Sequence, residues 1–199
     1  MLMSTPRSSN RKAEILDALA VMLEKSPGQR ITTAALAAQV GVTEAALYRH
    51  FPSKARMFEG LLDLMEQELQ QEFRVIFQTH KQAEARIQLM LEALLQFAGR
   101  RPGLCRLLTS EALQGEQERL RERVTLLLDS LEKQLKQCLR ERKLGTGKRH
   151  GDEAAVANLL LAFIEGRLHQ YVRSGFKEAP HLSFASQWPA LKAALFAQD

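Results

Sequence analysis

Apolar residues recur every three or four positions over most of this 199-residue chain, and this spacing predicts helices. The first expected helix follows possible capping residues at 8–10 and ends near Lys25, ahead of a Ser-Pro-Gly turn. Its apolar stripe consists of Ile15, Leu16, Leu19, Met22 and Leu23. Because the later stripes have the same period, we expect an all-α protein.

Prolines, glycines and capping residues divide the rest of the chain into further helical segments. The expected helices run from Lys54 to about Thr79, from about Gln82 to Gly99, from Pro102 to about Leu113, through the leucines between 120 and 139, from Asp152 onward, and from Phe184 to Phe196. The basic, glycine-containing segment Glu141–Gly151 is expected to form a mobile loop. It is not a nucleotide-binding loop, because its glycines and lysine lack the required spacing and a preceding strand.

Residues 32–51, TTAALAAQVGVTEAALYRHF, have the spacing of a helix-turn-helix. Thr33 can cap a first short helix, Gly41 permits the positive φ that ends it, and Thr43 can cap a second helix. The apolar anchors of the two helices would be Leu36, Val40, Val42 and Leu47. The free face of the second helix could then enter a DNA major groove.

The helix-turn-helix ends in YRHFPSK, residues 48–54, in which Phe-Pro, a cap and a lysine follow the second helix directly. This ending resembles TetR-type regulators. The similarity extends over almost the whole chain, through NRKAEIL, RPGLCRLLTSEAL and WPAL, and includes the members of that family that act in nucleoid occlusion. It implies a TetR-like all-α fold, with a three-helix DNA-binding head at residues 1–54 and a larger helical dimerisation and partner-binding domain at 55–199.

The net charge of +5 is concentrated in the expected head. Residues 1–56 hold eight Lys/Arg and four Asp/Glu, whereas residues 57–199 hold twenty and nineteen. A basic N-terminal module on a near-neutral body favours contact with phosphates. The simpler alternative is a solvated basic face without a partner.

Residues expected to contact double-stranded palindromic DNA lie in three places. Arg11 and Lys12 could reach phosphates or a minor groove as a flexible basic arm, or could belong to a frayed polar end. Thr32 and Thr33 stand where a helix N-terminus suits a phosphate, and Lys54 would point a cation at the same phosphate track. The candidates on the second helix are Thr43, Glu44, Ala45, Tyr48, Arg49 and His50.

Three of these residues leave alternatives open. The Tyr48 ring could pack on sugar and phosphate or in the core, and His50 could contact the DNA backbone or pack as a neutral ring. Glu44 suits a helix N-terminus but repels phosphate, which indicates few direct base contacts.

The two long helices at 54–79 and 82–99 each carry residues off their core stripe, and the two leftover faces could form one groove. The family resemblance implies that this groove binds the C-terminal tail of the division GTPase FtsZ while the protein is bound to chromosomal palindromes. The expected lining and rim residues are Leu64, Gln71, Arg74, Leu89, Ala93, Gln96, Arg100 and Arg101. Alternatively, Leu64 and Leu89 simply pack against neighbouring helices.

The helix from Asp152 has a wide apolar stripe that suits an oligomer interface. The TetR resemblance implies that it and the last helix pair with their copies across a two-fold axis, giving a homodimer. The candidate residues are Val156, Leu160, Phe163, Ile164 and Trp188. The alternative is packing within one chain.

No apolar run of about 18 residues and no export signal is found, so we expect a cytoplasmic, nucleoid-associated protein without a membrane span. Cys105 and Cys138 have no His or Cys partner at ligand spacing, which favours buried reduced thiols and no metal or cofactor. Because no catalytic set appears at plausible spacing, an enzyme is not expected. The alternative function is a TetR-type transcriptional repressor released from its operator by a small hydrophobic ligand.

Overall fold

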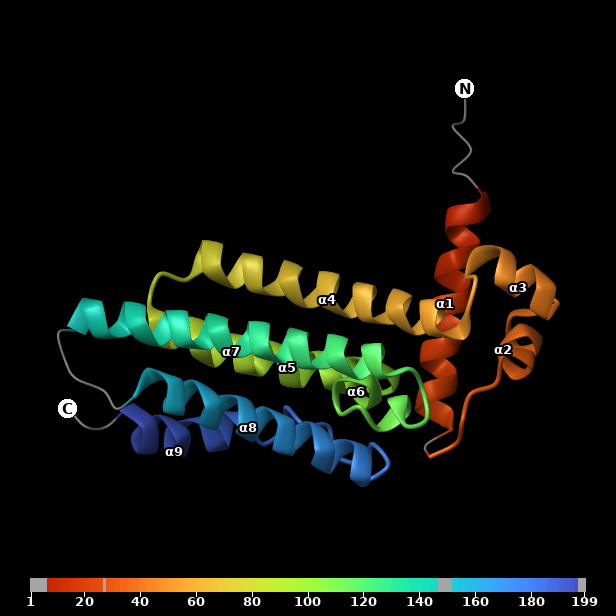
Figure 1. The fold of residues 1–199 in the computed structure, drawn as a ribbon. Helices are drawn as coiled ribbons and strands as arrows, with labels where there is room; N and C mark the ends of the chain where they lie inside the picture. The colour runs from red at the N-terminus through yellow and green to blue at the C-terminus, as the bar shows by residue number, and fades with distance from the viewer. Residues whose placement is uncertain (1–6, 27, 147–151, 197–199) are drawn as a thin grey trace.

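The computed structural model describes residues 7–26, 28–146 and 152–196, which form helices and connecting turns without any strand in these ranges. Three helices form a head at one end of an elongated body (Figure 1). The head consists of α1 Arg7–Lys25, α2 Thr33–Val40 and α3 Glu44–His50. The body consists of α4 Lys54–Thr79, α5 Ala83–Arg100, α6 Pro102–Leu108, η1 Glu111–Leu113, α7 Glu118–Thr146, α8 Glu153–Arg173 and α9 Phe184–Phe196. The all-α prediction is confirmed.

Local side-chain hydrogen bonds explain the short helices of the head. The Thr32 hydroxyl accepts a hydrogen bond from the Ala35 N–H at 3.2 Å, and the Thr43 hydroxyl accepts one from the Ala46 N–H at 3.2 Å. Gly41 ends α2 at φ 73°, a conformation that glycine adopts without steric cost. The two threonine caps and the glycine therefore define the turn, and of the two threonines at the start of α2 it is Thr32 that caps the helix.

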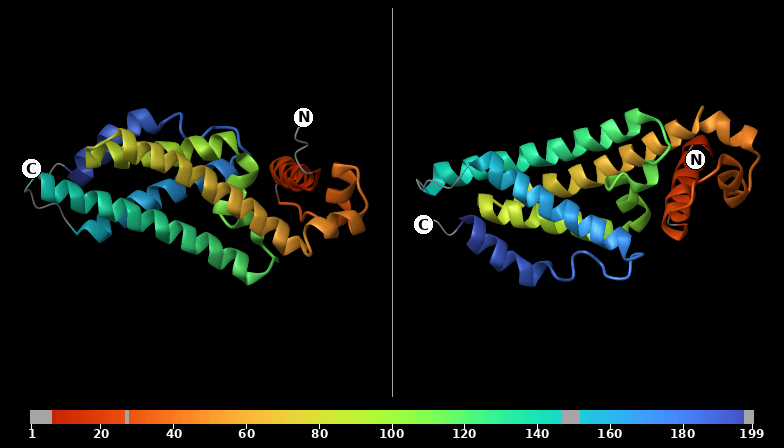
Figure 2. Two further views of the ribbon diagram at one scale, coloured as in Figure 1. Left: turned by 90° about the horizontal axis from the view of Figure 1, so that it is seen from above. Right: turned by 60° about the horizontal axis from the view of Figure 1, so that its bottom comes forward.

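α4 leaves the head and runs the length of the body beside α5 and α7 (Figures 1 and 2). Ser53 caps it by accepting a hydrogen bond from the Arg56 N–H at 3.2 Å, and it ends at Thr79 as predicted. Its stripe from Phe58 to Phe73 is buried, because these apolar side chains face the same side at helical spacing. One continuous helix thus joins the head to the far end of the body.

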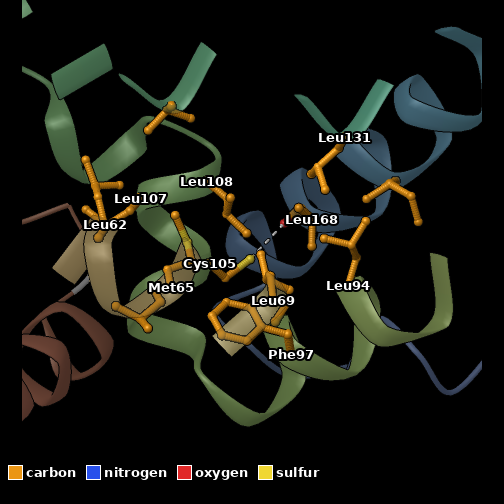
Figure 3. Packing of buried hydrophobic residues seen from close by; sticks show 14 of the residues in the cluster. Leu62, Met65, Leu69, Leu94, Phe97, Cys105, Leu107, Leu108, Leu131 and Leu168 are labelled. Atoms are coloured by element: carbon orange, nitrogen blue, oxygen red, sulfur yellow. Dashed lines mark hydrogen bonds between the residues drawn. The ribbon is translucent and has the colours of Figure 1, made fainter. Parts of the chain in front are cut away.

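Cys105 lies in the body core, among apolar side chains of α4, α5, α6, α7 and α8 (Figure 3). Its Sγ lies 3.9 Å from the Leu168 carbonyl oxygen, and burial raises the pKa of its thiol to about 12. Burial also raises the pKa of the Cys138 thiol to about 11. Both cysteines are free and buried, as predicted for cysteines without a His or Cys partner at ligand spacing.

Three predicted boundaries were wrong. α1 begins at Arg7, so residues 8–10 lie within the helix rather than capping it. The expected helix at 102–113 is two helices, because Ser110 adopts φ 57° between α6 and η1. α7 continues to Thr146, so the first half of the expected loop Glu141–Gly151 is helical, and residues 147–151 lie outside the described ranges.

Candidate nucleic-acid interface and partner groove

α3 presents one polar face to solvent and anchors the other in the core. Leu47 is fully buried, whereas Tyr48 is 41% exposed, and the Arg49 side chain is exposed and forms no ion pair with the described part of the chain. Thr43, Glu44 and Ala45 are exposed in the first turn, and His50 is half-buried at the end. The structure therefore exposes the predicted recognition residues of α3 to solvent, with His50 only partly accessible.

A hydrogen-bonded cluster joins this face to α2. The Thr33 hydroxyl donates to Glu44 Oε2 at 2.6 Å, and the Tyr48 hydroxyl donates to Thr33 Oγ1 at 3.4 Å. These contacts hold the Glu44 carboxylate against α2 and orient the Tyr48 ring along the surface. Thr33 thus links α2 to α3. Its partners Glu44 and Tyr48 are 11 and 15 residues away, so the local sequence pattern does not predict this link.

Arg11 and Lys12 belong to α1 and not to a flexible arm, which corrects the expectation for these residues. Arg11 Nη1 lies 2.8 Å from Glu14 Oε2, three residues along the same helix. Lys12 Nζ lies 5.7 Å from the centre of the Phe51 ring, a cation–π arrangement. Both cations therefore lie at fixed positions on the head.

Lys54 is not the free cation that the sequence predicted. Its Nζ lies 2.5 Å from Glu116 Oε1 and 5.5 Å from the centre of the Phe58 ring, and its side chain is only 19% exposed. The Ser53 cap starts α4 so that Lys54 faces the junction between head and body. In this structure the Lys54 ammonium is engaged by the body.

A groove with a volume of about 430 Å³ lies between α4 and α5. Apolar side chains line it, including Val75, which is 47% exposed. Polar and charged residues stand among them. The complete lining comprises Gln71, Glu72, Val75, Ile76, Leu89, Glu92, Ala93 and Gln96.

Four of the predicted groove residues, Gln71, Leu89, Ala93 and Gln96, do line this groove together. Leu64 does not: it lies further toward the head on α4, half-buried against the core, so the packing alternative holds for it. Ala93 is 8% exposed, which places it at the floor of the groove. Val75 and Ile76 also line the groove, one helical turn after Gln71 and Glu72, although they were not among the expected lining residues.

The expected rim cations are already paired with neighbouring groups. Arg100 forms an ion pair with Glu72, and Arg101 Nη2 lies 2.7 Å from Glu68 Oε1, so both pairs join α5 and its end to α4. Arg74 donates to Gln71 Oε1 at 3.2 Å. Arg100 and Arg74 thus contact residues that line the groove, whereas the partner of Arg101 lies outside the lining.

The predicted dimer residues lie mostly inside the protomer. Leu160 and Ile164 are 0% and 1% exposed, and Val156 and Trp188 are also buried, so these four side chains have little or no surface to give a partner. This corrects their assignment to an interface. Phe163 is half-buried against the Phe184 ring at 6.4 Å, and the same helix exposes 56% of Leu159.

No helix in the described ranges is long and apolar enough to cross a membrane. In those ranges there is also no cluster of three or more His, Cys, Asp or Glu side chains that could hold a metal ion.

Comparison with protein families gives two matches along the chain. Residues 15–61 match the family described as bacterial regulatory proteins, tetR family. Residues 81–196 match the SlmA-like family described as tetracyclin repressor-like, C-terminal domain. The two matches cover the helix-turn-helix with the start of α4, and then most of the body.

Similar proteins carry one recurring name. The chain is 55% identical over 185 residues to the nucleoid occlusion factor SlmA of Colwellia psychrerythraea, covering 92% of this chain and 93% of that protein. It is 57% identical over 180 residues to the nucleoid occlusion factor SlmA of Shewanella putrefaciens, covering 90% and 91%.

Solved structures with the same fold are more distant in sequence. The fatty acid degradation regulator FadR from Bacillus halodurans superposes with a TM-score of 0.76 at 14% identity, over 94% of this chain and 99% of that one. A TetR transcription regulator from Haloarcula marismortui gives 0.75 at 21% identity, over 93% and 98%. At such identities the likeness describes the fold alone.

Proposed function

Since the chain belongs to the SlmA family of TetR-type DNA-binding regulators, we propose that it binds chromosomal palindromes as a homodimer and there captures the C-terminal tail of FtsZ. Capture of the tail blocks assembly of the Z ring over the nucleoid. In this proposal the protein acts in the cytoplasm, on the nucleoid, and is not an enzyme. The observation that carries this proposal is the apolar groove between α4 and α5.

The DNA-binding part of the proposal rests on the exposed face of α3. Tyr48 and Arg49 stand on this face, and Leu47 fixes the helix from behind. A helix of this kind can lie in a major groove, and two heads related by a two-fold axis suit a palindrome. Glu44 reduces the attraction to phosphate on the same face, so contacts to the DNA backbone on either side supply most of the affinity.

The groove has the chemistry that the FtsZ tail requires. Such a tail is a short acidic and apolar peptide with some basic residues. Val75 and Leu89 offer apolar contact, and the Arg100 guanidinium can pair with an acidic side chain. Glu92, which accepts a hydrogen bond from Gln96 Nε2 at 3.1 Å, can pair with a basic one.

α4 connects the two proposed binding sites. It begins at Lys54 beside the helix-turn-helix and carries Val75 of the groove, about 30 Å along the helix at 1.5 Å per residue. A helix packed along its length moves as a unit, so a small shift of its first turn on DNA binding, without rotation of the head, reaches the groove wall. This continuity supports a tail site that responds to DNA.

Charge substitutions in the groove test the proposal. Val75→Glu and Leu89→Glu are expected to weaken binding of a fluorescent FtsZ tail peptide to the DNA-bound protein at least about tenfold, because each places a carboxylate against apolar peptide side chains. The matched control is Leu126→Glu, since Leu126 is 68% exposed on α7 and outside this groove. All three variants are expected to bind the palindrome with unchanged affinity.

Two outcomes would contradict the proposal. Tail binding by both groove variants at wild-type affinity would exclude the groove as the site. Absence of tail binding by the wild-type protein, even on DNA, would favour the TetR-type repressor released by a small hydrophobic ligand.

A further inference from the structure

α6 crosses α1 at backbone contact where the body meets the head. A Cβ atom on Gly103 would lie 2.1 Å from the Ala20 carbonyl oxygen and 3.2 Å from the Glu24 nitrogen. Since a real Cβ does not approach a backbone oxygen so closely, only glycine permits this crossing. The position of the head on the body is therefore defined within a narrow range at this point.

Arg106, one turn after Gly103 on α6, is 1% exposed and is the only charged residue among the buried ones of the described ranges. Its guanidinium donates to the Leu23 carbonyl and, at 3.0 Å, to the Ser26 carbonyl. The last carbonyls of a helix have no donor within the helix, so Arg106 supplies donors at the C-terminal end of α1. A cation at this end is also favoured by the helix dipole.

The other side of the guanidinium is held by the body. Arg106 Nη2 donates to Glu111 Oε1 at 3.0 Å, and Arg106 Nε donates to the second carboxylate oxygen. Ser110, at φ 57°, turns the chain so that η1 places Glu111 beside α6. We call Arg106, Glu111 and the carbonyls of Leu23 and Ser26 the junction clamp.

A second polar link joins the same segment of the body to the head. Glu116, whose side chain is 9% exposed, accepts from Lys54 Nζ at 2.5 Å, and Arg30 Nε lies 3.8 Å from the same oxygen. Residues 102–116 therefore contact the end of α1, the following loop and the start of α4.

The cost of burying a charge makes the junction clamp selective for one geometry. A buried guanidinium is tolerated when its donors are satisfied, and loss of its partners carries a large penalty. If the head rotated on α6, the Leu23 and Ser26 carbonyls would move away from Arg106 while the guanidinium stayed buried. The junction clamp therefore penalises other orientations of the head more strongly than an apolar contact, which can slide.

We propose that Arg106 is a positioning residue that fixes the angle of the head on the body and thereby sets the spacing of DNA half-sites that the dimer accepts. The inference rests on the proposed function in that it requires a dimer on a palindrome. The two heads of one dimer must reach half-sites at a fixed distance, about one turn of the DNA helix or a multiple of it. A head free to rotate would accept several spacings, and a clamped head accepts one.

The test varies the distance between the two half-sites while the sequence of each half-site stays constant. Wild-type protein first selects a palindrome from random DNA duplexes, and its two half-sites are then moved apart or together by one and two base pairs. The variants are Arg106→Met, which keeps a long apolar side chain, and Glu111→Gln, which leaves the guanidinium with its two carbonyl acceptors. The control is Arg123→Met, because Arg123 pairs with Asp63 and Glu66 within the body. Circular dichroism confirms that each variant is folded.

The expected readout is the ratio of affinities for the best and the shifted spacings. Wild type and Arg123→Met are expected to lose at least about tenfold on a two-base-pair shift, whereas Arg106→Met loses about threefold or less and Glu111→Gln gives an intermediate ratio. The base preference within each half-site is expected to stay the same.

Several results would overturn the inference. A folded Arg106→Met protein with the wild-type ratio, or with a uniform loss at all spacings, would show that Arg106 serves stability alone. If Arg106→Met does not fold, an unchanged ratio in Glu111→Gln has the same consequence. Failure of the wild type to select any palindrome would instead overturn the proposed function, and this inference with it.

Discussion

Arg49 is the exposed cation at the end of the candidate recognition helix, without an ion pair to any described residue. Its replacement by alanine is expected to weaken palindrome binding about tenfold near 0.1 M salt and to lower the salt slope by about one unit, because one phosphate contact is lost. Fluorescence anisotropy over a salt series measures both quantities. The matched control is Arg140→Ala, an exposed arginine on α7 in the body. Equal salt slopes for Arg49→Ala and Arg140→Ala would exclude Arg49 as a residue that contacts DNA.

At the scale of single residues, the sequence predicted what depends on close neighbours. Thr43, Ser53 and Gly41 act within a few positions of themselves, and their roles as caps and turn residue are confirmed. Lys54 shows where local reasoning fails. Its partner Glu116 is 62 residues away, and no periodicity of either segment indicates that the two meet.

At the scale of helices, the apolar period predicted where the elements lie but not what covers each stripe. The stripe of α8 suited both a core and an interface, and the structure assigns Leu160 and Ile164 to the core of one protomer. Apolar residues recur along a helix with the same spacing whether they pack against their own chain or against a second copy. The division of residues 102–113 into α6 and η1 escaped prediction because it depends on a positive φ at a serine.

The exposed side of α8 gives a prediction about the dimer. Leu159→Asp is expected to raise the dimer dissociation constant at least about tenfold, because a two-fold axis brings like charges together and an apolar contact is lost. Sedimentation velocity over a concentration series measures the change. Ile164→Asp is expected to unfold the protomer instead, since it buries a carboxylate in the core.

Leu126→Asp is the control for this experiment, because Leu126 is similarly exposed but lies on α7. A Leu159→Asp protein that dimerises as tightly as this control would place the interface away from the exposed side of α8.

At the scale of the whole molecule, the groove shows what the sequence and the family resemblance achieved together. The helical spacing and the resemblance predict one groove with Gln71, Leu89, Ala93 and Gln96, and these four residues line it. Arg100 and Arg101 were expected as free rim cations, and both pair with carboxylates on α4. Such exposed pairs contribute only about 0–1 kcal/mol, so an acidic peptide can replace the carboxylates at small cost. Charge pairing across helices depends on side-chain reach and rotamer, which composition and periodicity do not specify.

The proposed function requires that DNA binding by the head enables tail binding in the groove of the same molecule. It is tested most directly by the affinity of the wild-type protein for an FtsZ tail peptide, measured with the selected palindrome, with a scrambled duplex of equal length and without DNA. We expect the palindrome to raise tail affinity at least about tenfold over both other conditions, and the tail to raise palindrome affinity by the same factor, since coupling between two sites is reciprocal. Equal tail affinity in all three conditions, or no tail binding in any of them, would contradict this coupling between the two sites.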